Sequence, residues 1–227
     1  WISHFGFDPE KHPPYLTMAL GAGSVTPMQM AAGYSVFANG GYRVNPYLIT
    51  KVTDQMGKVL SEFTPPALDE SARAIDARNA FVMTSLLQEV TRSGTAARAQ
   101  ATLKRPDIYG KTGTTNDSMD AWFAGYHPTL TAVTWIGYDT PRKLGDRETG
   151  GGLSLPVWIG YMQHALQNVP IAEPAVPPGV SHDSGDWAYT EYGRGGGVSS
   201  LGLDGKSGNS ELPASDEKKR ILDLFKN

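Results

Sequence analysis

Three β-rich segments follow one another between residues 108 and 138, and this run constrains the fold more than any other feature of the sequence. The first segment, 108–115, is rich in threonine, and the next two, 119–127 and 130–138, are rich in aromatic and β-branched residues. His127-Pro128-Thr129 is a turn signal between the second and third. Because strands joined by short connections pair antiparallel, the run predicts a three-stranded meander.

The middle segment carries few polar side chains on either face. Its two alternating sets are Trp122, Ala124 and Tyr126 on one face and Ala121, Phe123 and Gly125 on the other. A sheet that is apolar on both faces needs cover on both sides, and helices before and after the meander supply it. The sequence therefore predicts an α+β fold in which helices cover both faces of an antiparallel sheet.

The sequence before and after this sheet predicts three helix starts and one hairpin. Thr26 and Gln29 form a predicted capping box, and Asp76 is the predicted cap of a second helix. Ser154 stands before Pro156 and is interpreted as a cap rather than a nucleophile. Residues 47–53 and 58–63 predict a hairpin, 92–99 a solvated connector, and 139–153 a glycine-rich loop.

The segment from Gly110 to Asp117, which reads GKTGTTND, carries the strongest functional signal. Lys111 offers a cation for a carboxylate, and Gly113 lets a ligand backbone approach closely. The backbone N–H of Thr114 is a candidate donor to an oxyanion. The alternative is a polar edge strand with a solvated lysine. A phosphate-binding loop is excluded, because it needs glycine where Arg105 stands.

Composition narrows the range of partners and cofactors. The 227 residues carry a formal net charge of −3 without a basic cluster, so we expect no nucleic-acid partner. The absence of cysteine excludes disulfides and thiol nucleophiles. The five histidines stand at no ligand spacing, so we expect no metal and no organic cofactor. The first residue is Trp1, and no apolar run spans a bilayer, so we expect any membrane anchor to lie upstream.

The motifs together resemble a known family. KTGTTND is followed by MDAWFAGYHP, by TWIGYD, and by a glycine-rich loop leading to LPVWIGYM. This order resembles the transpeptidase domain of class A, bifunctional penicillin-binding proteins of the penicillin-binding protein 1A type. The resemblance covers residues 1–169 as the C-terminal part of that domain, incomplete at its N-terminus. Residues 170–213 are expected to form a Pro/Gly/Ser-rich linker or tail, and 214–227 a short terminal helix.

The resemblance implies a peptidoglycan D,D-transpeptidase on the periplasmic side of the bacterial inner membrane. A serine is acylated by a D-Ala-D-Ala stem peptide, and the acyl group passes to the amine of a neighbouring stem. β-Lactams acylate the same serine. The implied substrate-binding residues are Lys111, Thr112, Gly113, Thr114 and Thr115, of which Lys111 and the Thr114 N–H are also catalytic. A glycosyltransferase region and the rest of the transpeptidase domain are implied partners.

Two expected motifs are missing ahead of Gly110. The family places Ser-x-x-Lys and Ser-x-Asn before K-T-G, and the only matches here are Ser207-Gly208-Asn209 and residues 215–218, in reversed order near the C-terminus. We therefore expect no nucleophile in this chain and no activity from it alone. A stand-alone serine hydrolase is excluded for the same reason. The alternative function is a non-catalytic peptide- or glycan-binding module.

Overall fold

The computed structural model describes residues 1–183 and 185–192. The chain divides after Thr190, and the first unit, Trp1–Thr190, holds the sheet and its helices. The serine motifs at 207–209 and 215–218 and the helix predicted for 214–227 lie outside the described residues. The predicted boundaries after residue 169, where the linker or tail begins, and after residue 213, where the terminal helix begins, therefore remain predictions.

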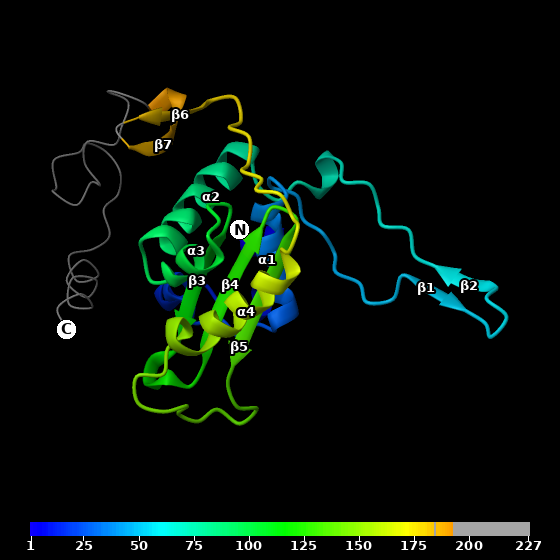
Figure 1. Cartoon of the computed structure of the whole chain (residues 1–227), viewed down its shortest axis with the longest axis horizontal. Helices are drawn as coiled ribbons and strands as arrows, with labels where there is room; N and C mark the ends of the chain where they lie inside the picture. Colours follow the sequence, from blue (N-terminus) through cyan, green and yellow to red (C-terminus); the bar gives the residue numbers. More distant parts are fainter. Residues whose placement is uncertain (184, 193–227) are drawn as a thin grey trace. The chain divides into compact units, whose positions relative to one another are not determined.

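The central sheet is the antiparallel meander that the sequence predicts. Its strands are β3 (Tyr109–Thr114), β4 (Ala121–His127) and β5 (Leu130–Ile136), in that order across the sheet (Figure 1). β3 pairs with β4 from Tyr109↔Tyr126 to Thr114↔Ala121. β4 pairs with β5 from Ala121↔Ile136 to His127↔Leu130. The motif strand β3 thus lies at one edge of this sheet.

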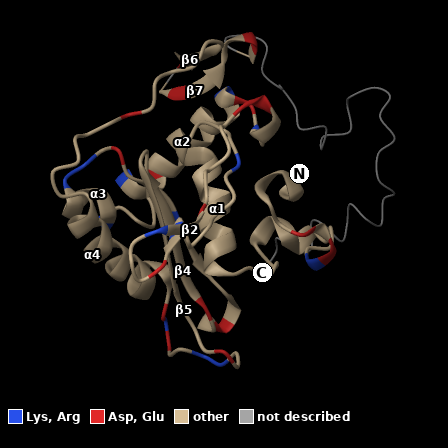
Figure 2. Ribbon diagram, turned by 90° about the vertical axis from the view of Figure 1, so that its right-hand side faces the viewer, with Lys and Arg blue, Asp and Glu red and all other residues tan. Residues whose placement is uncertain are grey.

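Helices α1 (Pro27–Ala38) and α2 (Ala77–Arg92) cover one face of the sheet (Figure 2). Tyr126 and Tyr109 stack at 5.0 Å between ring centroids, and Leu87 of α2 packs against them. Thr84 of α2 hydrogen-bonds the Tyr126 hydroxyl at 2.8 Å. Burial raises the pKa of both tyrosines, so their hydroxyls stay neutral and belong to the core.

Helices α3 (Arg98–Leu103) and α4 (Leu155–Ala165) cover the opposite face. Trp158 of α4 meets Phe123 edge-on at 4.8 Å and donates its indole N–H to the Ala132 carbonyl at 2.9 Å. Gly125 is required beneath this ring, because a Cβ there would lie 2.9 Å from Trp158 and 2.7 Å from the Tyr109 carbonyl oxygen. The α+β architecture with helices on both faces is confirmed.

Two of the predicted helix starts are confirmed in detail. The Gln29 N–H donates to Thr26 Oγ1 at 3.2 Å, and the Thr26 N–H donates to Gln29 Oε1 at 2.9 Å. Asp76 accepts from the Arg78 N–H at 2.8 Å at the start of α2. These pairs satisfy amide donors that the first helical turn leaves without partners.

Two hairpins lie outside the central sheet. The predicted one is confirmed as β1 (Lys51–Thr53) and β2 (Val59–Glu62), and β6 (Val180–Asp183) with β7 (Asp186–Tyr189) was not predicted. The solvated connector predicted for 92–99 is wrong at both ends, because α2 extends to Arg92 and α3 begins at Arg98. Its solvation is also only partial, since Ala96 and Ala99 are fully buried. The remaining helical segments are short, namely Ile2–Phe5, Pro9–Lys11, Leu16–Leu20, Glu70–Ala72, Asn116–Ser118, Gly150–Ser154 and Thr190–Tyr192. No helix among the described residues is long and apolar enough to cross a membrane.

Candidate functional site

The motif occupies the part of β3 that emerges from the core. Tyr109 and Gly110 are buried, Thr112 and Gly113 are half-buried, and Lys111 and Thr114 are exposed. Within the central sheet β3 pairs only with β4. Its outer backbone edge therefore has the geometry that an extended peptide uses when it adds to a sheet.

Alternation along the strand sends Thr112 and Thr114 to the same side. The hydroxyls of Thr112 and Thr95 lie 2.9 Å apart, and Thr114 Oγ1 accepts from the Gly150 N–H at 3.0 Å. Lys111 Nζ donates to the Thr112 carbonyl at 3.0 Å and lies 3.5 Å from Thr112 Oγ1. One cation and the two threonine hydroxyls thus lie along an open edge. A carboxylate is the group that such donors bind best.

A glycine turn holds this side of the strand in place. Gly150–Ser154 forms a π-helical turn whose first residue lies directly on β3. A Cβ at Gly150 would stand 2.2 Å from the Trp122 carbonyl oxygen and 2.5 Å from that of Gly113. Only glycine fits that approach without moving backbone. The last residues of the glycine-rich loop predicted for 139–153 therefore form a turn that packs against the motif strand.

Ser154 corrects one prediction. It precedes α4, but its side chain makes no cap hydrogen bond. Its hydroxyl is fully buried and donates to the Ala121 carbonyl at 2.6 Å. Ser154 thus connects the π-helical turn to β4, and its burial leaves it unsuited to act as a nucleophile.

Thr115 and Asp120 close the turn that follows the motif. The Asp120 N–H donates to Thr115 Oγ1 at 2.8 Å, and the Thr115 N–H donates to the Asp120 carbonyl at 3.1 Å. The Trp135 indole donates to Asp120 Oδ1 at 2.7 Å. Asp117 and Ser118 both adopt left-handed backbone at φ 59° and 51°, which non-glycine residues rarely do. The site therefore ends in a tight turn whose ends are fixed by hydrogen bonds.

Three residues that hold the motif in place were not predicted from the sequence. Thr95 lies in the segment interpreted as a solvated connector, Gly150 in the glycine-rich loop, and Asp120 in the β3–β4 turn. The hydrogen bond between Thr95 and Thr112 joins residues 17 positions apart in the sequence, and the one between Gly150 and Thr114 joins residues 36 positions apart. Local periodicity carries no signal for such contacts. The only sequence cue is the run of three glycines at 150–152.

An Asp–His pair lies near the start of β3. Such a pair can act as a general acid and base, but here both side chains are buried in the protein core. Asp107 and His127 are fully buried, and Asp107 Oδ2 lies 3.0 Å from His127 Nε2. Arg105 makes two hydrogen bonds to Asp107, at 2.9 and 2.8 Å. Burial would raise the pKa of Asp107, but the Arg105 side chain and the Ala172 N–H outweigh burial and hold it below its usual range. Burial lowers the pKa of His127.

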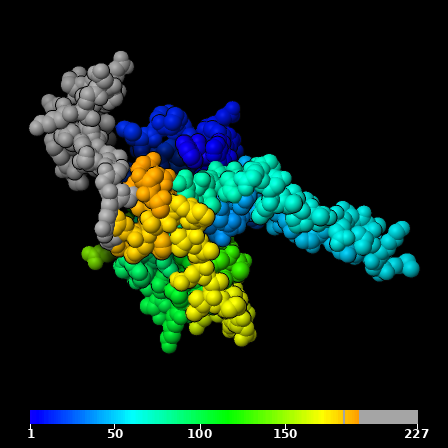
Figure 3. Space-filling model, turned by 90° about the horizontal axis from the view of Figure 1, so that it is seen from above, coloured from blue at the N-terminus to red at the C-terminus, as the bar shows by residue number. Residues whose placement is uncertain are grey.

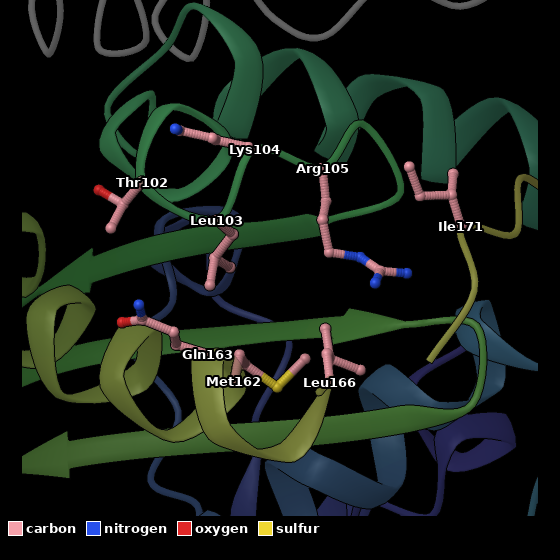
Figure 4. A pocket seen from close by; sticks show the side chains of 8 residues that line it. All are labelled: Thr102, Leu103, Lys104, Arg105, Met162, Gln163, Leu166 and Ile171. Carbon is pink, nitrogen blue, oxygen red and sulfur yellow. The ribbon is translucent and has the colours of Figure 1, made fainter. Parts of the chain in front are cut away.

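The described residues contain no group of three or more His, Cys, Asp or Glu side chains placed to hold a metal ion. A hollow of about 310 Å³ lies between α3 and α4, with Leu103 and Arg105 facing Met162 and Leu166 (Figure 4). Arg105, the half-buried cation that lines it, is already bound to Asp107 and to the carbonyls of Val169 and Pro170. A second, of about 180 Å³, lies between α2 and residues 173–187. Lys111 to Thr115 line neither hollow, so the open edge of β3 remains the candidate site.

The family model described as the penicillin-binding protein transpeptidase domain matches residues 10–157, which include the whole motif and its supporting turn up to Ser154. The chain belongs to the penicillin-binding protein transpeptidase family. It is 46% identical to penicillin-binding protein 1A of Neisseria flavescens over 82% of this chain and 23% of that protein. It is 41% identical to penicillin-binding protein 1A of Pseudomonas aeruginosa over 79% of this chain and 27% of that protein.

Solved structures agree with this membership. The crystal structure of penicillin-binding protein 1A from Haemophilus influenzae superposes with a TM-score of 0.75 at 32% identity, over 83% of this chain and 35% of that chain. Penicillin-binding protein A from M. tuberculosis, solved as an imipenem acyl-enzyme complex, superposes with a TM-score of 0.52 at 25% identity. That match covers 73% of this chain and 41% of the other chain. The resemblance to penicillin-binding protein 1A and the expected fold class are confirmed. The chain spans about a quarter of the length of the curated relatives it matches.

Proposed function

We propose that this chain supplies one wall of the acyl-transfer site of a longer peptidoglycan D,D-transpeptidase. The observation that carries the proposal is the exposed edge of β3, where Lys111 Nζ and the hydroxyls of Thr112 and Thr114 stand beside a free backbone edge. Members of this family act as serine acyltransferases, and one relative forms an acyl-enzyme with imipenem. The donor set fits the terminal carboxylate of a stem peptide or of a penicillin.

The residues of this chain would bind and stabilise rather than attack. Lys111 supplies positive potential, and the hydroxyls of Thr112 and Thr114 hold the terminal carboxylate of the donor peptide. The Thr114 N–H donates to the oxyanion that forms when a serine outside this chain attacks the penultimate carbonyl. The C–N bond then breaks and D-Ala leaves, and an acceptor amine displaces the serine from the ester. Gly113 leaves room for the donor backbone along the strand.

The supports of β3 give this wall its rigidity. Thr95 and Gly150 fix the orientation of the two threonine hydroxyls, and neither contact uses up a hydroxyl's capacity to bind a further group. Thr115, which belongs to the same proposed binding set, is held by Asp120. A preorganised wall costs little reorganisation when charge develops on the substrate.

The complete enzyme would work on the periplasmic side of the inner membrane, where stem peptides are available. Its anchor, its nucleophile and a glycosyltransferase region would belong to polypeptide outside these residues. The 227 residues alone would lack activity, because K-T-G residues bind and polarise a substrate without forming the acyl bond.

Labelling with a fluorescent penicillin tests the proposal. We expect covalent labelling of the full-length gene product and none of the 227-residue chain. An unlabelled stem pentapeptide ending in D-Ala-D-Ala should slow the labelling, because it occupies the same carboxylate site. Labelling of the 227-residue chain would place an active serine within it and overturn the assignment of the nucleophile. If neither protein is labelled, the proposal fails and the non-catalytic peptide- or glycan-binding module takes its place.

A further inference from the structure

The β1–β2 hairpin belongs to an arm, residues 44–69, whose apolar side chains are not covered by any other part of the described chain. Every residue of both strands is exposed. Figure 3 shows this part of the chain, in cyan, projecting from the rest of the first unit. Nine large hydrophobic side chains of the arm are 43% to 95% exposed, namely Tyr47, Leu48, Ile49, Val52, Met56, Val59, Leu60, Phe63 and Leu68.

Such an arm is not stable through its own contacts. A two-stranded hairpin is marginal in water, and a third strand or another packed surface is needed for stability. Among the described residues β1 and β2 pair only with each other, so each strand has one backbone edge that no described strand pairs with. Across the arm, two contacts join one side chain to another, a Lys51–Glu62 ion pair at 3.4 Å and a Tyr47–Phe63 ring contact at 4.4 Å. Exposed apolar patches of this kind mark interaction surfaces.

The base and the tip of the arm are nevertheless well formed. At the base, Arg73 and Tyr42 both bind Glu70, at 2.6 and 2.9 Å, and the Arg73 guanidinium lies over the Tyr42 ring at 4.2 Å. At the tip, Asp54 accepts from the N–H groups of Met56 and Lys58 at 2.9 Å each. The fold thus fixes where the arm leaves the body and how it turns, while its middle is left uncovered.

We propose that the arm docks against another part of the same polypeptide, outside these 227 residues, through its apolar side chains and a free strand edge. This rests on the proposed function, in which the chain is one part of a longer enzyme. The relatives are about four times as long as the piece matched here, so polypeptide for this contact exists in them. Lys51 and Lys58 balance Asp54 and Glu62, which disfavours an anionic membrane surface as the occupant.

Hydrogen exchange measured on the 227-residue chain and on the full-length gene product tests the docking. We expect the amides of residues 59–63 to exchange at least about tenfold more slowly in the full-length protein, because a docked strand edge is protected. The double variant Leu48→Asp with Leu60→Asp should abolish that protection. Leu20→Asp is the matched control, since Leu20 is 89% exposed and lies outside the arm, and it should leave the protection intact.

The outcomes separate the possible occupants. Equal exchange in both proteins overturns the docking. Protection that rises with protein concentration assigns the arm to a second copy, and protection that requires added anionic vesicles assigns it to a membrane, and either result overturns the proposal. Penicillin labelling of the same samples keeps the two proposals apart. A labelled protein with an unprotected arm contradicts only the docking, and an unlabelled protein with a protected arm contradicts only the proposed function.

Discussion

Asp107 is fully buried and still keeps its pKa below the usual range, because three groups stabilise its charge. Arg105 supplies two hydrogen bonds, and the Ala172 N–H supplies one at 2.8 Å. His127 completes the set, with its Nε2 lying 3.0 Å from Asp107 Oδ2. Since the two groups that could exchange a proton with a substrate, Asp107 and His127, are both fully buried, the cluster stabilises the fold rather than catalysing a reaction.

Asp107→Asn should lower the free energy of unfolding by about 3 kcal/mol, because it leaves Arg105 without its buried counter-charge. Asp146→Asn is the control, since Asp146 forms an exposed ion pair with Lys143. Such surface pairs contribute about 0.5 kcal/mol. Urea unfolding followed by circular dichroism measures both variants. Equal losses would show that Asp107 acts as an ordinary surface carboxylate.

His127 should make stability depend on pH below neutrality. Its folded-state pKa is lowered from 6.5 by burial, so the unfolded chain binds more protons as the pH falls below that value. Its contribution is therefore complete above about pH 6.5 and is lost progressively as the pH falls. His127→Gln should flatten the decline in unfolding free energy as the pH falls below about 6.5. His164→Gln, at an exposed position of α4, should leave the profile unchanged, and an unchanged His127→Gln profile would contradict the assignment.

Lys111→Ala should slow acylation of the full-length protein by penicillin without destabilising the fold. Lys111 is exposed and its hydrogen bonds are to its neighbour Thr112, so its removal costs little packing. Loss of one donor aimed at a reacting group typically costs about 10²-fold or more in rate. Lys104→Ala, an exposed lysine beyond α3, is the control for the loss of one charge. If melting temperature and labelling rate fall together in Lys111→Ala, the lysine has a structural role instead.

Among the elements, the π-helical turn Gly150–Ser154 is the one most closely fitted to the proposed site. Gly150→Ala should destabilise the protein by about 2 kcal/mol, because its Cβ meets backbone oxygen atoms that cannot move aside. The same change should slow penicillin labelling, since it displaces β3. Gly160→Ala adds a Cβ into open space on α4 and should be neutral or stabilising by up to about 1 kcal/mol. Equal behaviour of the two variants would mean that the turn can move away from β3.

Elements set by local chemistry were predictable, and elements set by distant contacts were not. The Thr26 capping box, the Asp76 cap and the β1–β2 hairpin follow from residues within a few positions of one another. The start of α3 depends on burying Ala99 beneath α4. The hydrogen bond of Ser154 depends on a strand 33 positions away, and sequence proximity favoured a cap instead.

The candidate site shows the same division. The motif strand and its meander could be predicted, because alternation and turn residues mark them in sequence. The contacts of Thr112 and Thr114 with Thr95 and Gly150 could not, since they join separate elements. The residues proposed to bind a substrate could thus be named from sequence, whereas the structure was needed to find the residues that hold them in place.

At the scale of the whole first unit, the described residues of the segment that follows α4, 169–183 and 185–189, join the two helical layers. They leave the end of α4, where Arg105 binds the carbonyls of Val169 and Pro170, and continue to β6 and β7 beside α2 (Figure 1). There Trp187 meets Phe81 of α2 edge-on at 5.0 Å. A segment fixed to both faces of the sheet opposes their separation, so its two attachments stabilise the same body.

Trp187→Ala should therefore lower the free energy of unfolding by about 3 kcal/mol, since it removes a large aromatic contact from α2. Trp1→Ala is the control, because Trp1 is 84% exposed, and it should cost less than about 0.5 kcal/mol. Hydrogen exchange adds a readout specific to the attachment, because the amides of 180–189 should lose protection in Trp187→Ala before those of β4 do. If β6 and β7 keep their protection, the hairpin is held by other contacts, and residues 169–189 do not depend on Trp187 to join the layers.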